Sequence, residues 1–211
     1  MFDLFKFKTL FFSPLVRFIV KHPNLMRSRL FLKAMRVFPE KISENYDEKI
    51  TKNMKKYQIS ILEGLNKINN DPKKILDACT GTGLAAFLAA DCFIEASVEA
   101  IDQSSKMIEV AKLNAIEKSI NRINFKEGNA INLSHNNETF DLFISSNAPI
   151  YLSEASRVLK TKGVILVSFS FGGKAISKAE RYISDYLLEN NIKLLELKSS
   201  GDGVYIIGQK F

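Results

Sequence analysis

The chain has 211 residues, of which 46% are hydrophobic and 25% are charged. This length and composition favour one globular domain with an appendage and argue against disorder. The two cysteines, Cys79 and Cys92, and the two histidines are too widely spaced for a disulfide framework or a histidine-based zinc site, so we expect reduced thiols and no metal. No run of 18 apolar residues occurs, and no transmembrane helix is predicted.

The basic character of the chain lies in residues 1–38. The formal net charge is +7, and this segment holds eight Lys or Arg residues against Asp3 alone. Charges interrupt its apolar runs, so we do not predict a signal peptide. Three interpretations remain open. The segment forms lid helices with solvated cations, or it contacts a membrane surface through interleaved Phe and basic residues. The third interpretation, nucleic-acid binding, has less support than the other two, because no RNA-binding module is visible in the sequence.

Helical periodicity is expected over residues 24–38 and 48–69, and from Lys74 onward strand and helix patterns alternate. The predicted strands are Ile75–Ala78, Ser97–Ile101, Ile123–Glu127, Leu142–Ser145, Val164–Phe169, Lys193–Lys198 and Val204–Gln209. The predicted helices between them lie near residues 83–91, 105–118, 150–160 and 174–190. Strands separated by helices of this length indicate βαβ units and a parallel sheet.

The last two predicted strands are joined by five residues, Ser199–Gly203, without a helix, which predicts an antiparallel hairpin. The predicted fold is therefore α/β: a doubly wound, mostly parallel seven-stranded sheet with a reversed C-terminal strand hairpin and an N-terminal helical extension. We divide the chain into a basic, Phe-rich helical extension or lid, residues 1–42, and a main domain, residues 43–211.

A glycine-rich turn follows the first predicted strand of the main domain. Asp77 closes that strand, and Gly81 and Gly83 then precede an Ala/Leu-rich helix. Such glycines let a ligand approach the backbone, and the helix start offers unpaired N–H groups. The turn formally matches the G-x-G-x-x-A pattern of dinucleotide sites. Asp77 favours a different ligand, because a carboxylate opposes a pyrophosphate and suits the ammonium group of a methionine moiety.

A second acidic residue, Asp102, ends the next strand, 19 residues after Gly83. A carboxylate there can accept hydrogen bonds from both hydroxyls of a ribose, which any adenosine cofactor provides. Its alternative role is a helix N-terminal cap.

Five blocks in sequence order resemble the class I S-adenosylmethionine-dependent methyltransferases. They are Asp77–Gly83, Ile101–Asn114, Phe125–Ala130, Phe140–Asn147 and Ala155–Val167. The resemblance implies that S-adenosylmethionine is the cofactor and that a reversed seventh strand ends the sheet. One departure stands in the first block, where Cys79 replaces the first glycine usual in the family's loop.

The resemblance also implies site residues. The methionine part of the cofactor would lie against Asp77, Thr80, Gly81, Thr82 and Gly83, with Tyr46 closing over it. The ribose would bind Asp102, and the adenine would lie near Gln103, Met107, Asn129 and Ala130. The methyl group would border Ser146, and the acceptor would contact Asn147 and Tyr151.

Methyl transfer to an activated sulfonium donor depends largely on positioning. We find no convincing general base, and we expect His135 to lie on the surface, at the wrong end of its neighbouring strand. We expect a small-molecule acceptor, hydrophobic or lipid-like, in a cytoplasmic protein with membrane association as an option. The alternatives are an RNA or protein methyltransferase, a nicotinamide-dependent oxidoreductase, and a non-catalytic S-adenosylmethionine-binding protein.

Overall fold

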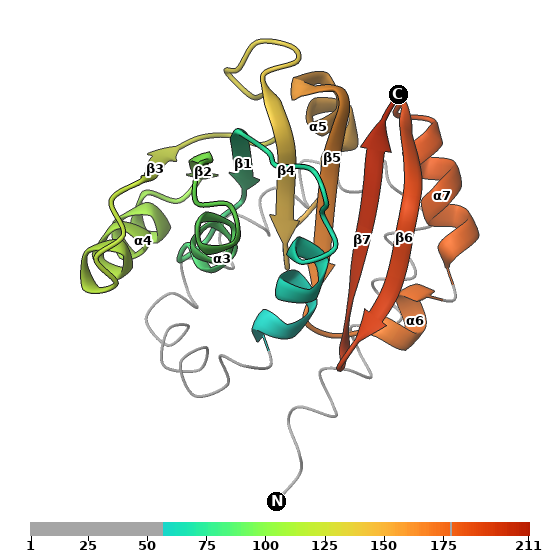
Figure 1. Ribbon diagram of the computed structural model, residues 1–211, viewed down its shortest axis with the longest axis horizontal. Helices are drawn as coiled ribbons and strands as arrows, with labels where there is room; N and C mark the ends of the chain where they lie inside the picture. The colour runs from blue at the N-terminus through green and yellow to red at the C-terminus, as the bar shows by residue number, and fades with distance from the viewer. Residues whose placement is uncertain (1–56, 178) are drawn as a thin grey trace, which may run out of the picture.

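A computed structural model describes residues 57–177 and 179–211. The predicted helix at 24–38, the lid at 1–42 and Tyr46 lie outside the described residues. The described chain forms a seven-stranded sheet with the order β3-β2-β1-β4-β5-β7-β6 (Figure 1). The strands are β1 Lys74–Ala78, β2 Ser97–Asp102, β3 Ile123–Glu127, β4 Phe140–Ser146, β5 Leu159–Phe169, β6 Ile192–Ser200 and β7 Gly203–Lys210.

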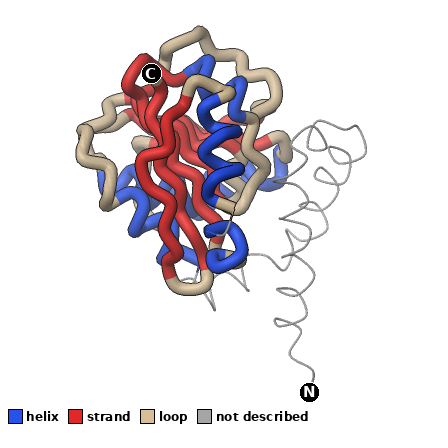
Figure 2. The backbone as a smooth tube through the Cα atoms, turned by 90° about the vertical axis from the view of Figure 1, so that its right-hand side faces the viewer, coloured by secondary structure: helices blue, strands red, loops and turns tan. Residues whose placement is uncertain are grey.

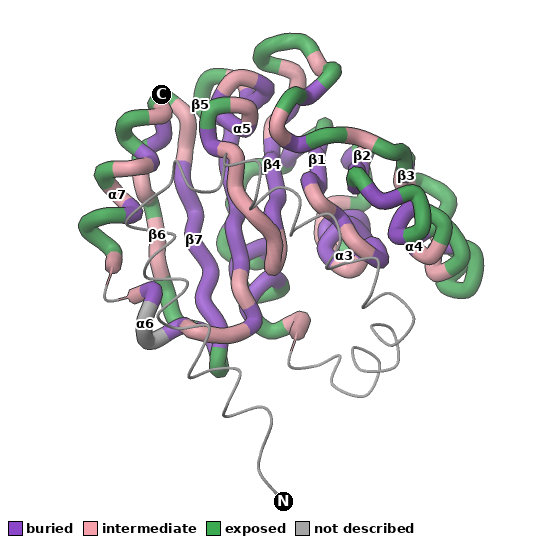
Figure 3. The backbone as a smooth tube through the Cα atoms, turned by 180° about the vertical axis from the view of Figure 1, so that it is seen from behind, coloured by how far each residue is buried: buried purple, intermediate pink, exposed green. Residues whose placement is uncertain are grey.

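Helices cover both faces of this sheet, as a view along its edge shows (Figure 2). The labelled helices are α3 Leu84–Cys92, α4 Ser105–Glu117, α5 Leu152–Val158, α6 Gly173–Ser177 and α7 Glu180–Leu188. One hydrophobic core holds side chains of α3, α4 and the helix at residues 57–65, and the other holds side chains of α5, α6 and α7. The central strands are buried along nearly their whole length (Figure 3), as expected of strands covered on both faces.

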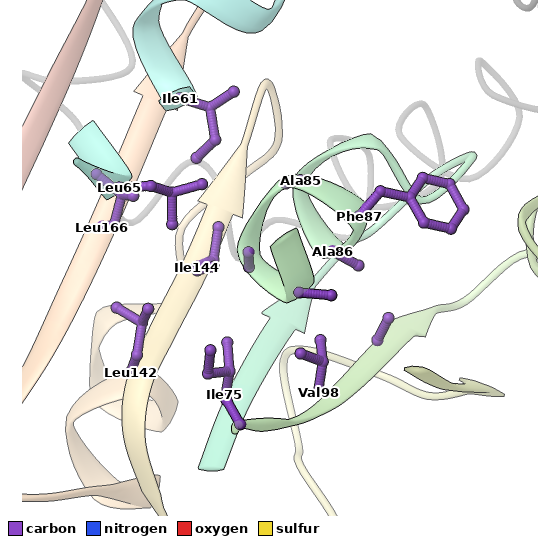
Figure 4. Close-up of a cluster of buried hydrophobic side chains, with 14 of the residues drawn as sticks. Ile61, Leu65, Ile75, Ala85, Ala86, Phe87, Val98, Leu142, Ile144 and Leu166 are labelled. Atoms are coloured by element: carbon purple, nitrogen blue, oxygen red, sulfur yellow. The ribbon is translucent and has the colours of Figure 1, made fainter. Parts of the chain in front are cut away.

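The helix at residues 57–65 belongs to the sheet domain. Ile61 and Leu65 are 0% and 1% exposed and lie over the central strands beside Ile144 and Leu166 (Figure 4). A Cβ on Gly64 would approach within 2.5 Å of a Leu166 methyl group, so the helix packs closely against β5. This helix is therefore an integral part of the first core.

The predicted doubly wound sheet and its reversed C-terminal strand are confirmed. Pairings among β1 to β5 are parallel, and β7 runs antiparallel to both β5 and β6. The predicted five-residue hairpin loop is too long, since pairing continues to Ser200 and Gly203. Two residues, Gly201 and Asp202, then make the turn, and Gly201 takes a left-handed φ of 58°.

Three further boundaries differ from those predicted. The helix expected over 174–190 is two helices, because Ala179 leaves helical geometry (φ −101°, ψ 14°). The helix expected over 48–69 ends at residue 65. Beyond it the backbone N–H groups bond three residues back instead of four, from Lys67 N to Gly64 O and from Ile68 N to Leu65 O. β5 begins five residues early, at the buried Leu159, because the exposed Thr161 and Lys162 that follow interrupt the apolar pattern. In the described part of the chain, no helix has the length and apolar character needed to cross a membrane.

Candidate functional site

The predicted site lies where the strand order reverses, between β1 and β4. In doubly wound sheets, ligands bind outside the carboxyl ends of the strands at this point. β1 ends at Ala78, β2 at Asp102 and β4 at Ser146, so the structure brings the acidic residues and the predicted acceptor residues to one edge of the sheet.

The glycine-rich turn is held by backbone bonds to β2 and by its own glycines. Thr80 N donates to the Ile101 carbonyl at 2.9 Å, and Gly83 N donates to the Thr80 carbonyl at 3.0 Å. Gly81 and Gly83 have left-handed φ angles of 56° and 92°. A Cβ on Gly83 would lie 2.8 Å from the Phe87 ring, whereas one on Gly81 would meet nothing within 4 Å. Gly83 is thus required for packing, and Gly81 leaves room above the turn.

The substitution of the family's first glycine does not abolish the turn. Cys79 adopts a φ of 60°, a conformation that a glycine would take without strain. Cys79 is half-buried, and burial, followed by the nearby carboxylates of Asp102 and Asp77, raises the pKa of its thiol to about 12. The thiol is therefore neutral at physiological pH.

Asp77 is the most unusual group of the site. Its side chain is 1% exposed; the Thr80 hydroxyl donates to Oδ2 at 2.5 Å, and Oδ1 has no hydrogen-bond partner among the described residues. Burial raises the pKa of Asp77 from 3.8 to about 7; the Thr80 bond and the Ala86 backbone amide oppose this shift, while the charge of Asp102 adds to it. A buried carboxylate oxygen without a donor is incomplete, and a cationic ligand would complete it.

Asp102 supports the turn through both of its carboxylate oxygens. Oδ2 accepts from Gly81 N at 2.9 Å, and Oδ1 accepts from Ser104 N at 3.0 Å. Burial raises its pKa, and these backbone donors work against that shift. The N-cap of α4 is Ser104, whose hydroxyl accepts from Met107 N, so the cap role does not fall to Asp102. Each oxygen keeps a lone pair for a ligand hydroxyl.

The predicted adenine residues come together beyond β2 and β3. Gly128 N donates to the Asp102 carbonyl at 2.9 Å, which places the start of the β3–β4 loop (residues 128–139) beside the end of β2. Met107 and Ala130 are buried, and Gln103 is exposed. The Asn129 amide oxygen already accepts from Ile131 N at 3.0 Å, which leaves one lone pair for a ligand.

Ser146, predicted to border the methyl group, and Asn147, predicted to contact the acceptor, both make side-chain hydrogen bonds to the end of β5. The Ser146 hydroxyl accepts from Ser168 at 2.9 Å. Asn147 has a left-handed φ of 53°, and its amide both accepts from Ser170 N and donates to the Ser170 hydroxyl. The Asn147 amide therefore fixes the ends of β4 and β5 to each other.

Tyr151, the N-cap residue of α5, lies close to Cys79. Burial, and secondarily the nearby thiol, raises the pKa of its hydroxyl to about 12. Together with Ile150 and Phe169, these two residues are partly buried against the second core. We call these four residues the apolar wall.

The prediction that His135 lies on the surface was wrong. Its side chain is 14% exposed, Nε2 pairs with the carboxylate of Glu99, and its ring packs edge-on against Phe140. The signal that could have revealed this is Glu99 itself, an acidic residue flanked by Val98 and Ala100 in the middle of β2. Glu99, His135 and Asn129 all line a small cavity of about 230 Å³.

A protein-family model described as a methyltransferase domain matches residues 69–194, more than half of the chain. The chain belongs to the S-adenosylmethionine-dependent methyltransferases. Their cofactor, S-adenosylmethionine, carries an ammonium group, which is the kind of cationic group that would complete the Asp77 carboxylate. The described residues include no group of three or more His, Cys, Asp or Glu side chains that could hold a metal.

Curated methyltransferases resemble the chain over part of their length. A demethylmenaquinone methyltransferase of Thermotoga maritima is 32% identical over 145 residues, which cover 64% of this chain and 60% of the relative. A ribosomal protein L11 methyltransferase of Carboxydothermus hydrogenoformans is 30% identical over 156 residues, 71% of this chain and 48% of the relative. The chain spans 24% to 60% of the length of the first relatives it matches.

Solved structures show the same fold. A SAM-dependent methyltransferase of Aquifex aeolicus superposes with a TM-score of 0.63 at 16% identity, covering 82% of this chain and 98% of its own. A methyltransferase of Haloferax volcanii in complex with the activator Trm112 gives 0.67 at 14% identity, with coverage of 82% and 96%.

Proposed function

We propose that this methyltransferase acts on a small hydrophobic, lipid-like acceptor. The apolar wall carries the proposal: its four residues are partly buried against the second core and lie at or just after the carboxyl ends of β1, β4 and β5. Both of its ionisable members have a pKa of about 12 and remain neutral at physiological pH. A neutral, largely apolar surface stabilises an apolar acceptor through surface burial.

The names of two relatives support an acceptor of this kind. One is the demethylmenaquinone methyltransferase of Thermotoga maritima. Another is a ubiquinone/menaquinone biosynthesis C-methyltransferase of Zymomonas mobilis, 38% identical over 96 residues. A neighbour in structure, at 14% identity, is a geranyl diphosphate methyltransferase. Quinone precursors and prenyl chains share a large apolar body.

The cofactor, when bound, would supply a methyl group on a cationic sulfur; in-line attack by the acceptor on that methyl carbon would break the carbon–sulfur bond and release S-adenosylhomocysteine. We assign the cofactor's ammonium group to Asp77 Oδ1, its ribose hydroxyls to Asp102 and its adenine to the region of Met107, Asn129 and Ala130. Thr82 lies within the turn, where its carbonyl accepts from the Asn114 amide at 3.2 Å. The chain's own contribution is orientation: two buried carboxylates and a rigid turn hold the donor while the apolar wall excludes water.

The N-terminal segment would bring such an enzyme to its substrate. Residues 1–38 alternate phenylalanines with lysines and arginines, a composition suited to an anionic membrane surface. We assign residues 43–211 to the methyltransferase domain and residues 1–42 to this contact. In flotation with anionic vesicles, changing Phe2, Phe5 and Phe7 to Ser in the full chain should reduce binding. Equal binding by the two proteins would refute the membrane contact.

A radiolabelled methyl-transfer screen tests the acceptor class. The full chain is incubated with labelled S-adenosylmethionine and with lipid extract, a demethylated quinol, ribosomal protein or RNA. Label in the organic phase is expected. Label in protein would instead favour a protein methyltransferase, such as the uL3 glutamine methyltransferase of Bordetella pertussis, which is 42% identical over 71 residues. Calorimetry with S-adenosylhomocysteine and NADH provides the cofactor control.

A further inference from the structure

The β3–β4 loop is attached to α5 by an ion pair that does not touch the predicted cofactor site. Glu154 lies in the first turn of α5 and Arg157 in its last turn, the arrangement that the helix dipole favours for each charge. Arg157 Nε and Nη2 each donate to a Glu154 carboxylate oxygen at 2.8 Å. Both side chains are half-buried: 29% of the Arg157 side chain and 17% of the Glu154 side chain are exposed.

This ion pair holds both backbone polar groups, the N–H and the carbonyl, of one loop residue, Leu133. Leu133 N donates to Glu154 Oε2 at 2.7 Å, and Arg157 Nη2 donates to the Leu133 carbonyl at 2.9 Å. Arg157 Nη1 also donates to the His135 carbonyl at 2.7 Å and to the Asn137 amide oxygen at 3.0 Å. Charge-assisted bonds of this length are stronger than neutral ones, so the middle of the loop is held rigidly.

The other end of the same loop carries the predicted adenine contacts. Asn129 and Ala130 lie four and three residues before Leu133, and the Asn129 side chain folds back onto Ile131 N. The buried side chains of Ala130 and Leu133 pack in the second core beside Ile101. A shift of the Leu133 peptide would therefore reach Asn129 through a short, packed stretch of backbone.

We propose that Glu154 and Arg157 are positioning residues for the adenine pocket, which they hold in place by binding the backbone N–H and carbonyl of Leu133. The proposal rests on the assignment of Asn129 and Ala130 to the adenine. Neither charged residue contacts the cofactor; their effect on its affinity passes through the loop.

The test compares Arg157→Met, which removes the donors and keeps the side-chain length, with Arg157→Lys, which keeps one charged donor. Calorimetry at 25 °C should show S-adenosylhomocysteine binding weakened roughly tenfold in Arg157→Met, within the range for coupled neighbouring groups. Arg157→Lys should restore part of the loss. Hydrogen exchange should accelerate at the Leu133 amide in Arg157→Met.

A double-mutant cycle with Asn129→Ala separates positioning from a general loss of stability. If the ion pair acts through Asn129, Arg157→Met should cost much less affinity in the Asn129→Ala background than in the wild type. Lys160→Met is the matched control, because it breaks the Lys160–Asp141 ion pair (2.6 Å) at the far end of β4. Its S-adenosylhomocysteine affinity should equal that of the wild type.

Unchanged S-adenosylhomocysteine affinity in Arg157→Met, with only a lower melting temperature, would overturn the proposal and leave the cofactor site intact. Absence of binding by the wild-type chain would instead overturn the cofactor assignment, and this proposal with it. The two failures are distinguished by the wild-type titration.

Discussion

Replacing Asp77 with Asn should stabilise the ligand-free protein above neutral pH and weaken cofactor binding. Burial raises the pKa of this carboxyl from 3.8 to about 7 in the folded chain. Because the folded pKa exceeds the unfolded one, stability is greatest below pH 3.8 and is lost as the pH rises through 7. A tenfold change in an acid dissociation constant corresponds to about 1.4 kcal/mol, so the ionised carboxylate costs about 4 kcal/mol at pH 9.

The amide removes this cost and keeps an acceptor for the Thr80 hydroxyl. The difference in unfolding free energy between Asp77→Asn and the wild type should therefore grow by about 3 kcal/mol from pH 5 to pH 9. Urea unfolding at pH 5, 7 and 9 measures it. Asp91→Asn is the control, because it removes an exposed carboxylate of equal charge. A difference that stays constant with pH would refute the titration of Asp77.

Cofactor affinity should rise with pH, in contrast to the stability of the ligand-free protein. The ammonium group prefers the ionised carboxylate. Below pH 7, wild-type affinity for S-adenosylhomocysteine should therefore rise by up to about tenfold for each increase of one pH unit. In Asp77→Asn, affinity at pH 8 should fall by about 10- to 100-fold, the effect of losing a charged hydrogen bond. A pH-independent wild-type affinity would show that the ammonium group binds elsewhere.

Further predictions concern the turn and its supports. Gly83→Ala should destabilise the fold by about 2–3 kcal/mol, because a left-handed residue with a Cβ would collide with Phe87; urea unfolding with wild-type stability would contradict this. Cys79→Val should cost about 2 kcal/mol, whereas Cys79→Gly should change stability by less than about 1 kcal/mol, because relief of strain offsets the entropy of glycine; equal effects of the two changes would disprove the strain. Asp102→Asn should weaken S-adenosylhomocysteine binding by about 10- to 100-fold in calorimetry, since the amide cannot accept from both Gly81 and Ser104, and unchanged affinity would exclude the ribose assignment.

Local sequence signals were sufficient for most of the fold. Apolar runs such as Ile75–Ala78 and Leu142–Ser145 are buried on both faces, so their composition alone predicts central strands. Strand segments with polar, exposed residues, as near the start of β5, carry no such signal. The predicted loop of the last hairpin is too long because serine is common in loops, whereas Ser199 and Ser200 pair with β7.

The sequence predicts site residues where an acidic residue lies at the end of a predicted strand. Asp77 lies one residue before the end of β1 and Asp102 ends β2, and the fold brings the ends of these adjacent parallel strands together. Contacts between distant segments could not be read from the chain. Arg157 meets Leu133 across 24 positions, and Asn147 meets Ser170 across 23. In both cases the partner is a backbone atom, whose availability no residue type reveals.

The helix at residues 57–65 changes what counts as the smallest independent unit of this protein. The family match begins only at residue 69, yet Ile61 and Leu65 lie wholly within the first core and each contributes about 2–3 kcal/mol by burial. Hydroxyl bonds from Ser60 to the Phe169 carbonyl and from Ser170 to the Tyr57 carbonyl fasten the same helix to the end of β5. A fragment cut at the family boundary would expose Leu166 and the rest of that face, and it would be prone to aggregate.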